Sequence, residues 1–267
     1  MPKTIGIIAI KGGVGKTTIS AALATDLVNH YNKKVLLIDA NFSAPNLALH
    51  MDIIQPNKTI HDVLTDKAKI TSTIHNRFGV DVIPGNYSFN SLFNPLKLKD
   101  KIQTIKNNYD FIILDSSPSL NEELLSTILA SDLIFVVSTP DYPTLSCSLK
   151  AAKLAKQRGR PIAGIILNKI RDPKYELPLK EIEQVLEIPV IARIHDDKTA
   201  TRSLFTRIPT TIYNKKTKFS KEISAISATL TNNKEKRSFL SLLFPNLKKE
   251  QINREILKKS FYTSRFK

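Results

Sequence analysis

An apolar run that passes directly into a glycine-rich loop constrains the fold of this chain more than any other feature. Residues 5–10 are apolar, residues 11–18 read Lys-Gly-Gly-Val-Gly-Lys-Thr-Thr, and residues 19–28 form a helix-forming stretch. Strand, glycine loop and helix in this order predict a phosphate-binding loop, in which backbone N–H groups and the helix N-terminus face the anion. Glycine suits such a loop because it tolerates positive φ and lets phosphate oxygens approach the backbone.

The members of this loop have separate expected roles. Lys16 is expected to reach the β- and γ-phosphates of a nucleotide, and Thr17 is expected to ligate Mg²⁺. The predicted nucleotide-binding residues of the loop are Gly12, Gly13, Val14, Gly15, Lys16, Thr17 and Thr18.

The loop departs from the general pattern G-x-x-x-x-G-K-[ST], because the first glycine of that pattern falls on Ile10. It fits x-K-G-G-x-G-K-[ST] instead, and this run resembles the deviant phosphate loop of the MinD/ParA group of dimeric P-loop ATPases. The resemblance implies that Lys11 crosses a dimer interface to the partner's nucleotide, so a homodimer is expected on ATP binding. The alternative is a glycine turn beside a solvated lysine.

Apolar, β-branched runs alternate with helical stretches along most of the chain. The predicted strands are residues 4–10, 34–39, 80–84, 109–115, 133–139, 162–168 and 189–194. The predicted helices are residues 17–29, 95–107, 121–130, 143–157, 178–186 and 219–230. Continuous hydrophobicity is what strands buried on both faces require. The predicted fold class is therefore α/β, with a mostly parallel sheet of about seven or eight strands and helices on both faces, as in P-loop NTPases.

Carboxylates stand at the ends of two predicted strands. Asp39 ends the strand over residues 34–39, and Asp115 ends the strand over residues 109–115. Ligands of parallel sheets bind at the carboxyl ends of the strands, and a carboxylate beside a phosphate loop holds Mg²⁺, usually through water. We therefore expect a metal site formed by Thr17, Asp39 and Asp115, with Asp115 as the Walker-B residue. The alternative role of Asp115 is to cap the helix that begins near Asn121.

The segment Asp39-Ala40-Asn41 resembles the first switch of the same family, usually Asp-x-Asp, whose second carboxylate positions or activates the attacking water. The amide of Asn41 orients water through hydrogen bonds but does not take its proton at neutral pH. Positioning and charge stabilisation supply most of phosphoryl-transfer catalysis. We therefore expect a slow Mg-dependent ATP hydrolase stimulated by an unidentified protein, with Lys11, Lys16, Asp39 and Asn41 as catalytic residues. A structural alternative is that Asn41 caps the turn that leads to Pro45.

Asn168 follows a buried strand and offers both a donor and an acceptor, which an adenine edge also presents. In MinD/ParA relatives the matching Asn contacts the base, so Asn168 is the expected adenine residue. A guanine-reading Asn-Lys-x-Asp motif would need Asp where Arg171 stands, and ATP is therefore predicted over GTP. His195 stands where relatives place a Pro-containing turn over the purine, and a plain loop histidine is the favoured interpretation.

The formal charge of +16 is concentrated toward the C-terminus. Residues 231–267 contain ten Lys and Arg against three Glu, and residues 193–221 contain eight against two Asp. This distribution indicates a polyanionic partner. The single cysteine, Cys147, excludes an internal disulfide and counts against the iron–sulfur relatives, which need several thiolates.

The alternation of strands and helices continues without a linker to about residue 230. One P-loop ATPase domain over residues 1–230 is therefore predicted, with a basic amphipathic C-terminal tail over residues 231–267. No apolar stretch reaches about 18 residues, and the first apolar run leads into the phosphate loop rather than into a signal-peptide pattern. A cytoplasmic location with reversible peripheral membrane association is expected.

Residues 238–261 contain two short amphipathic stretches. The first gathers the apolar residues between 239 and 244 on one helical face before Pro245, and the second sets Ile252, Ile256 and Leu257 among lysines. Apolar helices flanked by lysines fit an anionic membrane surface, and residues 236–244 resemble the membrane-targeting helix of MinD proteins. A terminal helix packed on its own domain is the structural alternative.

The sequence therefore leads to a MinD-like ATPase that dimerises on ATP, acts as a nucleotide-controlled switch in division-site or cargo positioning, and binds membrane through its C-terminal helix. The main alternative is a ParA-like ATPase of chromosome or plasmid partition, which would bind DNA without sequence preference through basic residues 202–218. A metabolic ATP-dependent enzyme is a third hypothesis, for which the sequence shows no substrate residues beyond the nucleotide site.

Overall fold

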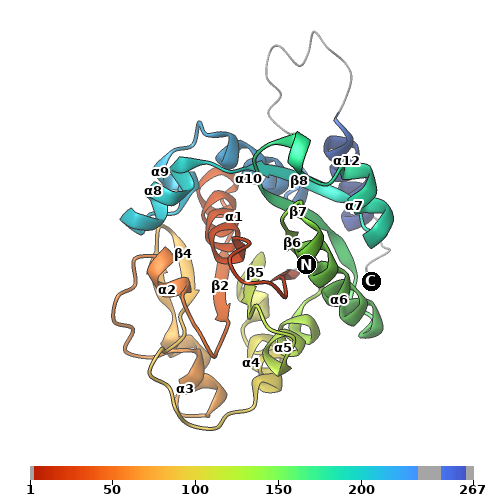
Figure 1. Cartoon of the computed structure of the whole chain (residues 1–267). Coiled ribbons are helices and arrows are strands. Elements are labelled where there is room, and N and C mark those ends of the chain that lie inside the picture. The colour runs from red at the N-terminus through yellow and green to blue at the C-terminus, as the bar shows by residue number, and fades with distance from the viewer. Residues whose placement is uncertain (1–2, 234–247, 263–267) are drawn as a thin grey trace.

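The sheet of this protein is mostly parallel. The computed structural model describes residues 3–233 and 248–262, and within these ranges the sheet contains eight strands: β1 (Lys3–Ile8), β2 (Val35–Ala40), β3 (His75–Arg77), β4 (Val80–Ile83), β5 (Phe111–Ser116), β6 (Leu133–Ser138), β7 (Ile162–Ile170) and β8 (Val190–His195). They lie in the order β3-β4-β2-β5-β1-β6-β7-β8, and only the β3–β4 pair is antiparallel (Figure 1). The predicted α/β fold is confirmed. β3 was not predicted, because its three polar residues form no apolar run.

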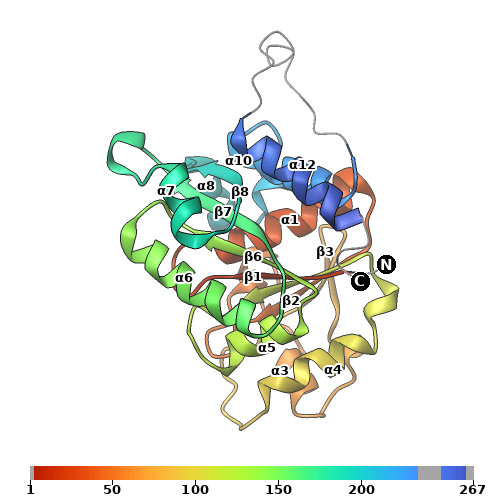
Figure 2. The same cartoon turned by 90° about the vertical axis from the view of Figure 1, so that its right-hand side faces the viewer.

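Helices cover both faces of the sheet. Those in the described residues are α1 (Lys16–Tyr31), α2 (Leu47–His50), α3 (Ile60–Leu64), α4 (Leu98–Gln103), α5 (Glu122–Ala130), α6 (Tyr142–Gln157), α7 (Leu179–Leu186), α8 (Lys198–Thr206), α9 (Thr210–Tyr213), α10 (Lys218–Leu230) and α12 (Lys249–Tyr262). Figure 2 shows α1, α10 and α12 on one side of the strands and α4, α5 and α6 on the other. The predicted helix over residues 95–107 is divided into α4 and two flanking 3₁₀ turns, Pro95–Lys97 and Lys106–Asn108.

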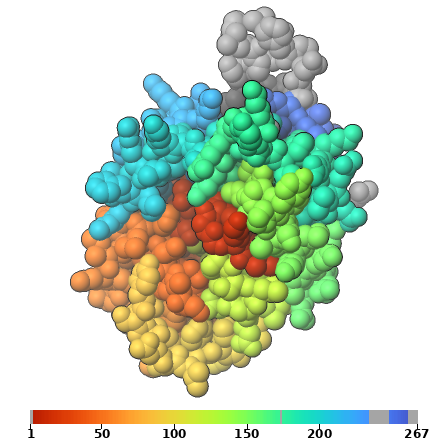
Figure 3. Space-filling model, viewed as in Figure 1, coloured from red at the N-terminus to blue at the C-terminus, as the bar shows by residue number. Residues whose placement is uncertain are grey.

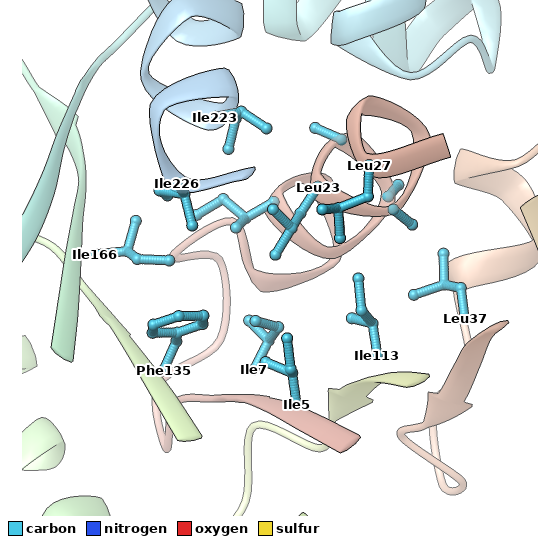
Figure 4. Close-up of a cluster of buried hydrophobic side chains, with 14 of the residues drawn as sticks. Ile5, Ile7, Leu23, Leu27, Leu37, Ile113, Phe135, Ile166, Ile223 and Ile226 are labelled. Atoms are coloured by element: carbon cyan, nitrogen blue, oxygen red, sulfur yellow. The ribbon is translucent and has the colours of Figure 1, made fainter. Parts of the chain in front are cut away.

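The central strands fix α1 in place through a buried apolar cluster. Ile5 and Ile7 of β1 pack beneath Leu23 and Leu27 of α1 (Figure 4), whereas Ile8 belongs to a second cluster on the opposite face. Each fully buried side chain of this size stabilises the fold by roughly 1.5–3 kcal/mol. Because β1 and α1 are both anchored, the glycine loop between them is held at the carboxyl edge of the sheet.

The helix α12 packs against the edge strand β8 and the helix α10. Leu257 is buried in the core cluster, and the Arg254 Nη1 donates to the Ile191 carbonyl at 2.6 Å. The Asn253 side-chain amide donates to the Val190 carbonyl at 2.7 Å. The side chains of α12 therefore occupy backbone acceptors that an edge strand would otherwise leave open.

Of the two amphipathic stretches predicted in the C-terminal region, the structure describes the second. Residues 238–245 lie outside the described residues, whereas the second stretch forms α12. Only Leu257 of its three apolar residues faces the domain, and Ile252 and Ile256 are 45% and 61% exposed. No helix within residues 3–233 and 248–262 combines the length and the apolar character needed to cross a bilayer.

Candidate functional site

The phosphate loop follows β1 and leads into the first turn of α1. Gly13 and Gly15 have φ of 77° and 94°, which side chains with a Cβ adopt only with strain. Gly15 is the residue before α1, and Lys16 is the first residue of that helix. The loop therefore turns its backbone toward the helix N-terminus, where the partial positive charge of the helix favours an anion.

A cavity of about 500 Å³ opens at this loop. In Figure 3 the red surface of the N-terminal part of the chain is visible in the hollow at the centre of the face. The predicted site residues that line the cavity are Gly12, Gly13, Gly15, Lys16, Thr17, Thr18, Asn41 and Asn168. Four other predicted residues, Lys11, Val14, Asp39 and Asp115, are not among the lining residues, and each of them has a distinct place in the structure.

Asp115 lies behind the phosphate loop and contacts Thr17. It is fully buried at the end of β5, and it accepts hydrogen bonds from the Thr17 hydroxyl at 2.7 Å and the Ser20 hydroxyl at 3.0 Å. Burial raises the pKa of Asp115, while the hydrogen bond from Thr17 and the charge of Lys16 act in the opposite direction. The adjacent hydroxyl and carboxylate fit the oxygen ligands that Mg²⁺ prefers, and the bound ion would neutralise charge on phosphate oxygens.

Asp39 is the register neighbour of Asp115 on the adjacent strand. One of its carboxylate oxygens accepts from the Asn41 backbone N–H at 3.1 Å, and the other accepts from the Leu47 N–H at 3.0 Å. Burial and the nearby charge of Asp115 raise the pKa of Asp39 well above its usual range. Asp39 therefore shapes the loop that carries Asn41, and its expected role toward the metal stays a prediction.

Lys16 extends into the cavity from the start of α1 and is itself buried. Burial lowers the pKa of Lys16, and the neighbouring Asp115 partly opposes that effect. A cation in this position is stabilised further when an anion enters the cavity, because opposite charges at short range favour the charged form. The expected contact of Lys16 with the terminal phosphates of a nucleotide stays a prediction.

The two polar atoms of the Asn41 side chain have different surroundings. The Asn41 Nδ2 donates to the Ala44 carbonyl, which holds the turn toward Pro45. Asn41 Oδ1 is buried and has no hydrogen-bond partner within residues 3–233 and 248–262. The residue lines the cavity, but its Oδ1 is enclosed by protein. The expected role of Asn41 toward the attacking water therefore stays a prediction.

Lys11 points to the N-terminus of α6. Its Nζ lies 3.7 Å from Asp141 Oδ1, and both side chains are 44% exposed. Asp141 also caps α6 by accepting from the Thr144 N–H at 2.9 Å. The Lys11 ammonium is therefore held near the surface, paired with a partner that is itself partly exposed.

The far end of the cavity is formed by β7, β8 and α8. The Asn168 Nδ2 donates to the Val14 carbonyl at 2.8 Å, which ties this end to the phosphate loop. Arg171 Nε lies 2.7 Å from Asp196 Oδ2 across the opening. His195 lines the cavity, and burial together with the charge of Lys218 lowers the pKa of its ring. The position of Asn168 is compatible with base recognition, which stays a prediction.

Several lining residues were not predicted from the sequence, and two of them lie at the ends of α2. Asn46 accepts from the Thr17 hydroxyl at 3.1 Å, and His50 lines the cavity from the end of α2. Burial lowers the pKa of His50 to about 4, so its ring is neutral at physiological pH. Because α2 has only four residues, no periodic pattern marked this segment.

Comparisons with known proteins agree with this site. A family model described as an AAA domain matches residues 2–154. An uncharacterized ATP-binding protein of Methanocaldococcus jannaschii is 33% identical over 257 residues, which cover 92% of this chain and 97% of that protein.

Two solved structures resemble most of this chain in fold. The cell division ATPase MinD of Pyrococcus furiosus has a TM-score of 0.80 and 29% identity, over 87% of this chain and 98% of that chain. The septum site-determining protein MinD of Pyrococcus horikoshii OT3, solved with Mg-ADP, has a TM-score of 0.79 and 29% identity, over 84% of this chain and 93% of that chain.

Proposed function

The chain belongs to the MinD/ParA family of P-loop ATPases, and we propose that it is a nucleotide-controlled spatial switch that forms a homodimer when it binds ATP. In this proposal ATP and Mg²⁺ occupy the cavity at the phosphate loop. The dimer then binds a cellular surface and positions a division site or another cargo. Hydrolysis of ATP, stimulated by a partner protein, then converts the dimer back to monomers.

The position of Lys11 is the observation that carries the proposal. Lys11 is not among the residues that line the cavity, although the adjacent Gly12 is, and its side chain is 44% exposed beside Asp141. An exposed ion pair contributes about 0–1 kcal/mol, so Lys11 leaves Asp141 at little cost. A lysine held in this way is available to the nucleotide of a second copy of the chain.

Slow hydrolysis follows from the identity of residue 41. In the proposed reaction the amide of Asn41 orients the attacking water once its buried Oδ1 is opened to the cavity, but an amide does not take a proton at neutral pH. We predict that Asn41→Asp raises the basal kcat about tenfold or more, because general base catalysis contributes roughly 10²–10⁴-fold when fully developed. An unchanged or lower kcat in a phosphate-release assay would count against the assigned role.

The membrane is the proposed surface, through residues 238–261. Within α12 the exposed apolar residues are Ile252 and Ile256, and lysines lie on both sides of them. Each basic residue near an anionic surface adds about 1 kcal/mol. One copy would bind weakly, whereas an ATP dimer presents two such regions to one surface, and avidity then multiplies the affinity by about 10² or more.

DNA is the alternative surface, through residues 202–218. Arg202, Arg207, Lys215 and Lys216 lie on and after α8 and are exposed. Phe205 is 90% exposed on the same helix. Basic side chains of this kind bind phosphates without sequence preference.

Co-sedimentation with anionic vesicles and with plasmid DNA separates the two surfaces. The wild-type protein is compared in ATP and in ADP with the Ile252→Glu/Ile256→Glu and Lys215→Glu/Lys216→Glu variants. All four positions are exposed, so the fold is expected to persist in both variants. The membrane proposal predicts ATP-dependent vesicle binding that only the isoleucine variant loses. ATP-dependent DNA binding that only the lysine variant loses would establish the alternative, and binding unaffected by nucleotide would refute the switch.

A further inference from the structure

The loop that carries Asn41, residues 41–46, is held by contacts from several separate elements. Asp39 accepts from the Asn41 backbone at its start, and Asn46 accepts from the Thr17 hydroxyl at its end. In the middle, the His61 Nε2 lies 3.1 Å from the Phe42 carbonyl. The orientation of Asn41 in the cavity therefore depends on the conformation of the whole loop.

A further contact to this loop comes from the first turn of α5. Glu123 Oε1 accepts from the Ser43 backbone N–H at 3.0 Å and also from the Ser43 hydroxyl. Ser43 itself is exposed, whereas Glu123 is only 5% exposed. Glu123 Oε2 is buried and has no partner within the described residues.

Helix capping does not account for this carboxylate. The side chain of Asn121 already caps α5 by accepting from the Leu124 N–H at 3.2 Å. The helix dipole favours acidic residues in the first turn, and the exposed neighbour Glu122 supplies such a charge without the cost of desolvation. Burial of Glu123 with one unpaired oxygen opposes folding, so the contact with Ser43 needs an explanation beyond the stability of α5.

The placement of Glu123 in the chain supplies one. Asp115 ends β5, Ser116 and Pro118 line the cavity, and α5 begins four residues after Pro118. The first turn of α5 is therefore joined to the loop that follows Asp115 by a short connection. Through Ser43, Glu123 links that loop to the loop of Asn41, which lines the same cavity.

We infer that Glu123 is a positioning residue for ATP hydrolysis, which couples residues 116–121 to residues 41–46 so that the two loops change conformation together when the nucleotide changes. The inference rests on the proposed function, because it concerns turnover at the same cavity. Ser43 is the contact point, and the two hydrogen bonds on one carboxylate oxygen fix its distance from α5. This contact thereby fixes the position of Asn41 Oδ1 relative to the loop that follows Asp115.

Single and double substitutions with a matched control test this coupling. Glu123→Ala removes both hydrogen bonds to Ser43 and is expected to lower kcat about tenfold or more, with KM for ATP unchanged within about twofold. Ser43→Ala removes only the hydroxyl bond and keeps the backbone N–H bond, so a smaller loss of kcat is expected. The double variant is expected to lose no more than Glu123→Ala alone, because that substitution already removes the whole contact. Glu122→Ala removes the same charge from the same helical turn and is expected to leave kcat unchanged.

Conservative replacement and a readout independent of turnover separate positioning from folding. Glu123→Gln keeps an oxygen acceptor for Ser43 and is expected to retain most of the wild-type kcat, even if Glu123→Ala folds poorly. Hydrogen exchange is then compared between ADP and a non-hydrolysable ATP analogue. In the wild type the analogue is expected to protect residues 41–46 and 116–121 together, and in Glu123→Ala, which lacks both hydrogen bonds to Ser43, only the second segment.

Two results would overturn the inference: a double variant with a lower kcat than Glu123→Ala, or unchanged joint protection of both loops in Glu123→Ala. A wild-type protein that binds the analogue but hydrolyses no ATP would refute the proposed function while the exchange experiment still decides the coupling. Joint protection lost in Glu123→Ala would then support the link between the loops in the absence of turnover.

Discussion

Gly15 is the position in the phosphate loop where substitution should be most informative. Its φ is 94°, and a Cβ built there would lie 2.3 Å from Asn168 Nδ2. Gly15→Ala therefore forces Asn168 away and breaks its hydrogen bond to the Val14 carbonyl. The left-handed backbone costs about 1–2 kcal/mol, and the buried groups left unpaired cost about 1–3 kcal/mol.

Gly13→Ala is the matched control for this substitution. Gly13 has a φ of 77°, but nothing lies within 4 Å of a Cβ built there. Gly13→Ala therefore introduces the backbone strain without a steric clash. Both glycine variants lower the conformational entropy of the unfolded chain to the same extent, so this contribution to the free energy of unfolding cancels in the comparison. Gly15→Ala should therefore be less stable than Gly13→Ala by about 1–3 kcal/mol.

Thermal unfolding and urea titration measure the difference. For a chain of this size 1 kcal/mol shifts Tm by roughly 2–4 °C, so the two variants should be separated by several degrees. In an Asn168→Ala background the clash is absent, and Gly15→Ala should then cost no more than Gly13→Ala does. Equal Tm values for the two glycine variants in the wild-type background would refute the reasoning.

Two further predictions concern stability. Burial lowers the pKa of His50 from 6.5 to about 4, so between these values the unfolded chain binds a proton that the folded protein does not. The free energy of unfolding should therefore rise by about 2 kcal/mol from pH 5 to pH 7. His50→Gln should flatten this dependence in urea titrations at the two pH values, and an equally steep dependence would contradict it. Arg254→Ala should cost about 1.5–3 kcal/mol by releasing α12 from Ile191, whereas the exposed Glu255→Ala should stay within about 0.5 kcal/mol. Equal urea midpoints would show that Arg254 does not anchor the helix.

The strands and the phosphate loop were predictable because local chemistry determines them. β1, β2 and β5 are continuous apolar runs, and a strand followed by a glycine loop and a helix has few other structural meanings. The same reasoning placed Asp39 and Asp115 at the carboxyl ends of two strands, and the structure adds that β2 and β5 are neighbours whose register brings the two residues opposite each other.

The contacts that shape the site depend on distant segments and were not predictable in the same way. The hydrogen bond from Asn168 to Val14 joins residues 154 positions apart. The bond between Ser43 and Glu123 requires the packed geometry of two loops, and no spacing rule relates them. An amphipathic pattern is equally compatible with protein and with lipid, so only the structure shows that Leu257 packs on the domain.

The central claim is that Lys11 completes the ATP site of a second copy of the chain. Sedimentation velocity of wild type and Lys11→Ala in ATP and in ADP tests it most directly, with nucleotide binding measured in parallel. The expected result is a wild-type dimer in ATP, a monomer in ADP, and a Lys11→Ala variant that binds ATP but stays monomeric. A wild-type protein that stays monomeric while saturated with ATP, or a Lys11→Ala variant that dimerises as the wild type does, would contradict the claim.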